Sequence, residues 1–354
     1  MPLPEVLRQL LTAAGPSGYE SAPAAVFAEA GRRFTDDVEI DVMGSAVARV
    51  KGTAADAPFL IVVGHIDEIG LIVTHIDDNG FLRFMGVGGW DPQILVGQRV
   101  EITTRDGVVP GVAGRKPIHL LRDEEREKVP KLRDLHIDIG AKDGDEAREL
   151  VRIGDVAVIA GQPVELANDR VVSRSMDNRL GSFIALEAAR LVAEAGGAPG
   201  DVAALGVVQE EITFGGARTS AFRLEPDVAI VVDVTHETGS PGVDVNEIGK
   251  HEFGQGAVIE RGSVLNPAVF ELLHDAAERE QIPFTIQASA RSTGTDADAI
   301  HLSRAGVPTG GVSIALRYMH SSVEMVQLDD IEACARLIAA FAQALGAETS
   351  FART

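Results

Sequence analysis

Two adjacent carboxylates, Glu210 and Glu211, follow an apolar run at 203–208 that is typical of a strand buried on both faces. Neighbouring side chains on a strand point to opposite faces, so the two carboxylates converge only where the strand ends. An isolated pair of this kind is more often part of a solvated loop, because burying it is costly unless another group compensates the charge. The alternative is one metal ligand beside one general base, and it gains weight if other apolar runs end in the same way.

Two further apolar runs end in residues of the same chemical types. The run 59–63 leads to His65 and Asp67, and the run 228–232 leads to Asp233. In an open α/β sheet the functional site lies outside the carboxyl ends of the strands. We therefore expect the imidazole and the carboxylates from the three runs to meet at one edge of a sheet.

Two more residues with ligand chemistry are placed less clearly by the sequence. His320 follows a last predicted strand at 309–316, and Asp177 lies at the predicted start of a helix. A histidine in a loop is more often a surface residue than a ligand, and an aspartate at a helix start is more often a cap. The residues by themselves leave both roles open.

The elements around these residues predict an α/β fold with a mixed, mainly parallel sheet flanked by helices. The apolar runs are short, rich in β-branched residues and free of polar alternation, and helical patterns lie between them. From about 69 to 166 the pattern changes to short strands joined by turns, without a long helix. We therefore predict an α/β domain formed by 1–68 and 167–354, interrupted by an inserted β-rich domain at 69–166.

The composition excludes several classes of partner. The chain has 354 residues, above the size at which one hydrophobic core usually stops growing. Its 53 acidic residues against 32 Lys and Arg give a net charge of −21, which argues against nucleic acid and against an anionic membrane surface as partners. No run is long enough to span a membrane, and the first residues lack the pattern of a signal peptide. The single cysteine, Cys334, fits a reducing compartment, so we expect a cytoplasmic protein.

The order of the motifs resembles that of the glutamyl/deblocking aminopeptidase family, across nearly the whole chain. The segments that carry the resemblance are Gly64–Gly70, Gly88–Pro92, Ser173–Arg179, Gln209–Glu211, Val232–His236, Gly294–Asp296 and Arg317–Ser321. The resemblance implies an exopeptidase that removes N-terminal residues from peptides with two metal ions. It also implies that the inserted domain is a PDZ-like dimerisation domain, and that dimers assemble into a twelve-subunit tetrahedral particle.

The resemblance further implies a set of five metal ligands. One ion would be held by His65, Asp177 and Asp233, and the other by Asp177, Glu211 and His320. Asp177 would then bridge the two ions. Ligands of this kind, imidazole and carboxylate without thiolate, suit Zn²⁺ or Co²⁺, and also Mn²⁺.

Two residues outside the ligand set are implied to take part in catalysis. Asp67 would orient His65, and its position two residues later suits a partner that fixes the imidazole tautomer. Glu210 would be the general base, since an unliganded carboxylate beside a ligand can deprotonate water and protonate the leaving amine. Paired ions polarise the scissile carbonyl and make hydroxide available near neutral pH, so a hydroxide bridging the ions is the expected nucleophile.

Two alternative functions remain. A related two-metal enzyme would cleave acyl groups or C-terminal residues, and a non-catalytic scaffold would form particles without a working site. A degraded site should have lost a ligand, and none of the five is missing. The chain departs from the family pattern at four positions that are not ligands, Thr213, Gly215, Gln255 and Asp298.

Overall fold

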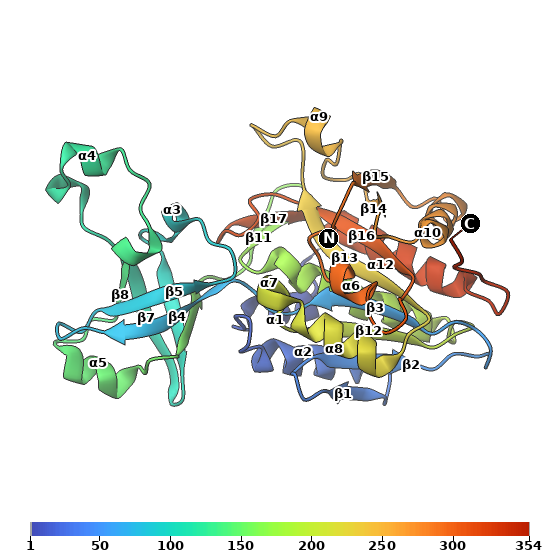
Figure 1. Ribbon diagram of the computed structural model, residues 1–354, viewed down its shortest axis with the longest axis horizontal. Coiled ribbons are helices and arrows are strands. Elements are labelled where there is room, and N and C mark those ends of the chain that lie inside the picture. The colour runs from blue at the N-terminus through green and yellow to red at the C-terminus, as the bar shows by residue number, and fades with distance from the viewer. Residues whose placement is uncertain (1, 354) are drawn as a thin grey trace.

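The computed structural model describes residues 2–353, and its main body is built on an eight-stranded sheet (Figure 1). The strands follow the order β1-β2-β12-β3-β13-β16-β14-β15. Strands β12, β3, β13 and β16 are parallel neighbours, as are β14 and β15, while β1, β2 and the β14–β16 contact are antiparallel. The predicted mixed, mainly parallel sheet is therefore confirmed. The strands are β1 (Val38–Ile40), β2 (Ala46–Val50), β3 (Leu60–His65), β12 (Val202–Val207), β13 (Val228–His236), β14 (Ala257–Gly262), β15 (Phe284–Ser289) and β16 (Thr309–Leu316).

Helices cover both faces of this sheet, which explains why its central strands are uninterrupted apolar runs. Val62 packs into one core cluster, whereas Ile61 and Val63 pack into another, because alternate side chains of a strand point to opposite faces. The first cluster lies under α1 (Glu5–Thr12), α2 (Ser21–Gly31), α6 (Met176–Glu194), α10 (Pro267–Arg279) and α12 (Leu328–Ala344). The second lies under α8 (Gly215–Leu224) and α11 (Ala297–Ile300).

The strand β3 and the helix α6 approach each other so closely that only glycine fits at the contact. A Cβ atom on Gly64 would lie 2.2 Å from the carbonyl carbon of Gly181 and 2.3 Å from the amide nitrogen of Ser182. The Ser182 hydroxyl donates to the carbonyls of Gly64 and His65, at 3.1 and 2.9 Å. This contact holds the end of β3, with His65, against the first turns of α6.

The segment between β3 and the second half of the α/β domain forms a separate closed barrel, at the left of Figure 1. Its order is β4-β5-β8-β7-β6-β9, all neighbours are antiparallel, and it encloses its own apolar core. The predicted small β-domain is therefore present, with 99–114 in the barrel and not in the main sheet. Its strands are β4 (Gly70–Ile76), β5 (Leu82–Val87), β6 (Arg99–Thr104), β7 (Gly107–Gly114), β8 (His136–Asp138) and β9 (Val156–Ile159).

Short helices connect the barrel strands. They are α3 (Pro92–Leu95), α4 (Asp123–Arg126), α5 (Gly144–Leu150) and the 3-10 turns η1 (Ile118–Leu120) and η2 (Leu132–Asp134). The charged stretch at 122–133 contains the helical turn α4, and it projects from the barrel in Figure 1.

A small antiparallel sheet joins distant parts of the chain beside the barrel. It consists of β10 (Val164–Leu166), β11 (Arg170–Ser173) and β17 (Glu324–Gln327), in that order. The last residues of the predicted insertion, in β10, pair with β11 and not with the barrel. We propose the domain division 1–68, 69–166 and 167–354, with β10 as the return to the α/β domain. The pairing of β11 with β17 sets Glu324 opposite Ser173, close to the start of α6.

A long connection after β13 carries the one-turn helix α9 (Val245–Ile248), at the top of Figure 1. Among residues 2–353, no helix combines the length and the apolar character needed to cross a membrane.

The contact between β3 and α6 predicts a large effect for Gly64→Ala. The added methyl group meets backbone atoms that cannot rotate away, and overpacking of this kind costs about 1–3 kcal/mol or more. We expect a lower midpoint in urea unfolding of the metal-free protein. Gly161→Ala is the matched control, because a Cβ at Gly161 meets nothing within 4 Å. Equal midpoints for the two variants would contradict the close contact.

Candidate metal centre

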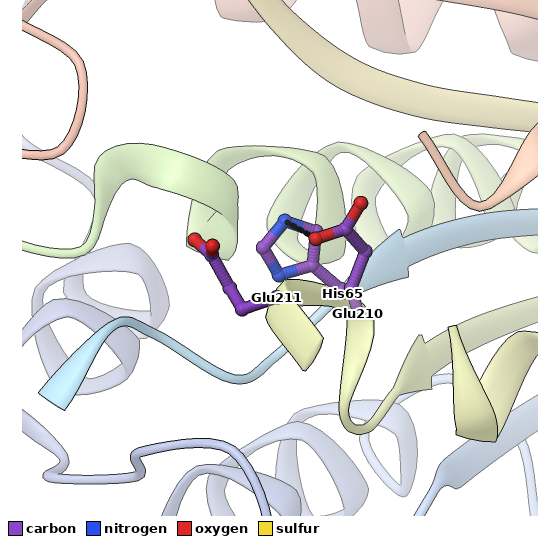
Figure 2. Close-up of side chains that lie close together, drawn as sticks. All are labelled: His65, Glu210 and Glu211. Atoms are coloured by element: carbon purple, nitrogen blue, oxygen red, sulfur yellow. Dashed lines mark ion pairs between the residues drawn. The ribbon is translucent and has the colours of Figure 1, made fainter. Parts of the chain in front are cut away.

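The structure brings all five expected ligands to the carboxyl edge of the main sheet. His65 is the last residue of β3, and Asp177 lies in the first turn of α6. The loop after β16 carries His320. Figure 2 shows His65 with Glu210 and Glu211.

Two of the strand ends differ from the sequence-based expectation. Glu210 and Glu211 begin a one-turn helix, α7 (Glu210–Thr213), where a loop was expected. The chain turns into it at Gln209, which has a positive φ of 63°. Asp233 lies inside β13, which pairs with β3 only as far as Val231 and continues along β16. Asp233 therefore lies beyond the last β13–β3 pair, on the side of the sheet edge where His65 ends β3.

Asp177 faces two imidazoles at once. Its Oδ1 is 3.1 Å from Nε2 of His65, and its Oδ2 is 3.4 Å from Nε2 of His320. Nε2 of His320 is also 3.3 Å from Oε1 of Glu211. Burial would raise the pKa of Asp177, but the hydrogen bonds from the two histidines outweigh burial and lower it. A carboxylate with one oxygen toward each of two nitrogen ligands has the geometry of a bridging ligand.

Three overlapping groups of side chains have ligand atoms within 4.8 Å of one another. They are His65, Asp177 and Asp233; Asp177, Glu211 and His320; and His65, Glu210 and Glu211. The first two groups match the two expected ligand sets. Imidazole and carboxylate donors at this spacing fit a divalent ion such as Zn²⁺ or Co²⁺, and the carboxylates need a cation nearby to be stable as charged groups.

Asp67 connects the imidazole of His65 to the two glutamates. Its side chain is fully buried, and its Oδ1 lies 3.3 Å from Nδ1 of His65. Its two oxygens accept hydrogen bonds from the backbone amides of Glu210 and Glu211, both at 3.1 Å, and from the Ser17 hydroxyl at 2.6 Å. Burial opposes ionisation, yet these donors and His65 lower the pKa of Asp67. Asp67 is therefore a charged group that sets the position of the turn carrying the glutamates.

Glu210 is a largely buried carboxylate beside His65. Its Oε2 lies 3.7 Å from Nε2 of His65, and burial raises its pKa to about 8 although His65 opposes this. Burial likewise raises the pKa of Glu211 and of Asp233. A divalent cation at the site favours the charged forms and lowers these pKa values again.

Two contacts that sequence reasoning missed hold His320 and Asp177. Both backbone amides donate to the buried carboxylate of Glu324, at 2.7 Å from His320 and 3.2 Å from Asp177. Nδ1 of His320 lies 2.9 Å from the carbonyl of Gly89, and since a carbonyl only accepts, Nδ1 carries the proton of the neutral ring, so that Nε2 is the nitrogen available to a metal ion. In the sequence, these contacts were indicated only by the short spacing from His320 to Glu324 and by the Gly88–Pro92 motif.

A buried network of ion pairs holds the first turn of α6 in place. Glu68 pairs with Arg174 and, at 3.2 Å, with Arg179, whose guanidinium is fully buried. Arg179 also donates to the carbonyls of Leu10 and Ala13, at 2.6 and 3.1 Å. These contacts tie the residues on both sides of Asp177 to the segment that follows β3 and to the N-terminal helix.

Among the described residues, Asp296 is a further buried carboxylate beside the centre, and neither of its oxygens has a hydrogen-bond partner. Burial raises its pKa, and so does the charge of Asp233. Asp296 belongs to the segment Gly294–Asp296, one of those that resemble the family. Its neighbour Asp298, one of the four departures from the family pattern, accepts three hydrogen bonds from Thr293 and Gly294 at 2.8–2.9 Å. Asp298 therefore stabilises the loop that carries Asp296.

The remaining departures have local contacts. The Gln255 side chain accepts from the amide of Glu252 at 3.0 Å. Thr213 Oγ1 lies 3.4 Å from the carbonyl of Gln209, and a Cβ on Gly215 would lie 2.8 Å from the Gln209 side chain. None of the three belongs to a candidate ligand group in the described part of the chain.

Comparison with known proteins gives one consistent family. The model of the M42 glutamyl aminopeptidase family matches residues 44–337. The lysyl aminopeptidase of Pyrococcus furiosus is 34% identical over 347 residues, which cover 96% of this chain and 97% of that protein.

Solved structures agree with this result over the same length. A TET aminopeptidase from a marine sediment archaeon of the Thaumarchaeota superposes with a TM-score of 0.91 at 35% identity, covering 96% of both chains. The TET1 peptidase of Pyrococcus horikoshii, described as able to assemble into a tetrahedron or a large octahedral shell, gives a TM-score of 0.84 at 31% identity, covering 96% of this chain and 99% of that one. This chain, a hydrolase acting on peptides, belongs to the M42 glutamyl aminopeptidase family.

Proposed function

We propose that this protein is a two-metal aminopeptidase that hydrolyses the bond after the N-terminal residue of a peptide. Membership of the family supports the reaction. The observation that carries the two-ion proposal is Asp177, whose two oxygens face His65 and His320 in separate ligand groups. The donor set supports Zn²⁺ or Co²⁺, with Mn²⁺ as a further candidate.

The proposed roles of the side chains follow from their contacts. Two bound ions would supply Lewis acidity at the scissile carbonyl and lower the pKa of water. Glu210, which the two proposed ligand groups do not use, accepts the proton of the attacking water and passes it to the leaving amine. Asp67 orients His65 through Nδ1, so that Nε2 faces the ligand group, and it holds Glu210 and Glu211 in place through their amides.

A peptide panel tests the reaction class. We expect cleavage of peptides with a free amino terminus, with release of their first residue, and no cleavage of the same peptides after N-terminal acetylation. Mass spectrometry of the products reads out which end is cut. Release of the acetyl group or of the C-terminal residue would favour the alternative deacylase or carboxypeptidase. A metal-replete protein that cleaves none of the peptides would favour the scaffold.

The substitution Glu210→Gln tests the general base. The amide cannot accept the proton from water, so turnover should fall by about 10²–10⁴. Metal content, measured by elemental analysis of the purified variant, should stay at the level of the unmodified protein. Loss of metal in this variant would mean that Glu210 is a ligand.

The substitution Glu211→Gln should reduce activity for a different reason, the loss of metal. It removes a charge from the Asp177, Glu211 and His320 group, so one of the two ions should be lost or bound more weakly. Excess metal should then restore part of the activity, whereas it should restore none in Glu210→Gln. If both variants keep their metal and their activity, the proposed roles of the two glutamates are wrong.

We also propose that the protein works as a homo-oligomer, with dimers built through the barrel domain and twelve subunits in a tetrahedral particle. The P. horikoshii relative supports the assembly, since it is described as a tetrahedron or an octahedral shell. Light scattering of metal-replete protein should give a mass near twelve times 37.4 kDa. A fully active monomer would contradict the proposed assembly without affecting the chemistry. We further propose that the protein acts on peptides in the cytoplasm, while its net charge of −21 argues against nucleic acid and anionic membranes as partners.

A further inference from the structure

Glu324 joins two residues of the candidate metal centre that lie far apart in the sequence. It is the first residue of β17, and only 2% of it is exposed. Its Oε1 accepts from the amide of His320 at 2.7 Å, and its Oε2 accepts from the amide of Asp177 at 3.2 Å. One buried carboxylate thus links the loop after β16 to the first turn of α6.

The hydrogen bond from the His320 amide to Glu324 stabilises an unfavourable backbone conformation at His320. His320 has a positive φ of 59°, a backbone conformation that residues other than glycine rarely adopt. Its surroundings must therefore stabilise this conformation. Glu324 holds the backbone of this residue, and the carbonyl of Gly89 holds its ring at 2.9 Å. With both contacts made, Nε2 lies 3.3–3.4 Å from the carboxylates of Glu211 and Asp177.

Glu324 is not itself placed as a ligand. Each of its oxygens already accepts a hydrogen bond from a backbone amide, and none of the candidate ligand groups found among residues 2–353 includes it. Its effect on a metal ion must therefore pass through the positions of Asp177 and His320.

We propose that Glu324 is a positioning residue that sets the affinity of the Asp177, Glu211 and His320 group for its metal ion. The inference rests on the two-metal function proposed above. The group formed by His65, Asp177 and Asp233 shares only Asp177 with it, so that group depends less on Glu324. Removing the hydrogen bonds to Glu324 should therefore lower the affinity for one ion much more than the affinity for the other.

The test compares Glu324→Gln with a control that has the same local chemistry. The two amides bond to different oxygens of Glu324, and a glutamine replaces one of these oxygens with an NH2 group, which donates and cannot accept from the amide facing it. Asp330 is also buried and also accepts from two backbone amides, those of Gly254 and Gly256, at 2.9 and 2.8 Å, but it touches no candidate ligand. Asp330→Asn therefore controls for the general cost of removing such a carboxylate.

The measurement is the binding of Co²⁺ to metal-free protein by equilibrium dialysis, followed by the visible absorption of the bound ion. We expect two ions in the unmodified protein and in Asp330→Asn, and one of the two affinities lowered about 10- to 100-fold in Glu324→Gln. Thermal unfolding of the metal-free variants compares the loss of stability that each substitution causes by itself. If Glu324→Gln does not fold, Glu324→Asp, which keeps both oxygens but is too short to reach both amides, is judged by the same criterion.

The outcomes separate this inference from the function on which it rests. Wild-type affinity for both ions in the Glu324 variant would overturn the inference and leave the two-metal function standing. If Asp330→Asn lowered the affinity for the same ion equally, the inference would also be overturned, because the lower affinity would then come from a general loss of stability. Fewer than two ions in the unmodified protein would overturn the two-metal function itself, and the inference with it.

Discussion

The structure depends on keeping several carboxylates close together in a buried place. Asp177, Asp233, Glu211 and Glu210 meet at one edge of the sheet, and burial raises the pKa of the last three. Inside the chain, the imidazoles of His65 and His320 reduce this cost, and backbone amides reduce it for the neighbouring carboxylates of Asp67 and Glu324. These partners are too few to neutralise the site, which is why the residues fit divalent cations.

Backbone amides are well suited to hold such a centre because they are part of the fold. Asp67 accepts from two consecutive amides at the start of α7, and Glu324 accepts from amides on two different elements. Through these amides both carboxylates act on the path of the chain, and Asp67 also contacts the imidazole of His65. The positions of Asp177, Glu211 and His320 thus depend on main-chain geometry, which varies less than the rotamer of a long side chain.

The barrel domain is also part of the environment of the centre. The carbonyl of Gly89 accepts from His320, and a Cβ on Gly88 would lie 3.2 Å from Oε2 of Glu211. The indole of Trp90 donates to the carbonyl of Gly70 at 2.7 Å, which anchors this turn to the start of the barrel. A domain that the sequence suggested mainly for association therefore also orients a candidate ligand.

The sequence by itself determined the α/β class, the presence of a β-rich insertion and the residues with ligand chemistry, because apolar runs, turn-linked short strands and the polar residues that end the runs are local patterns. That the insertion closes into a barrel was decided by the structure. It did not reveal that α7 begins at Glu210, since a one-turn helix has too few residues for a periodic pattern. Nor did it reveal Glu324 or Gly89, whose roles arise from contacts with residues on other elements and, for Gly89, from another domain. Only the tertiary structure decided those contacts, because the pairing of β11 with β17 and the placement of the barrel depend on packing between segments that are distant along the chain.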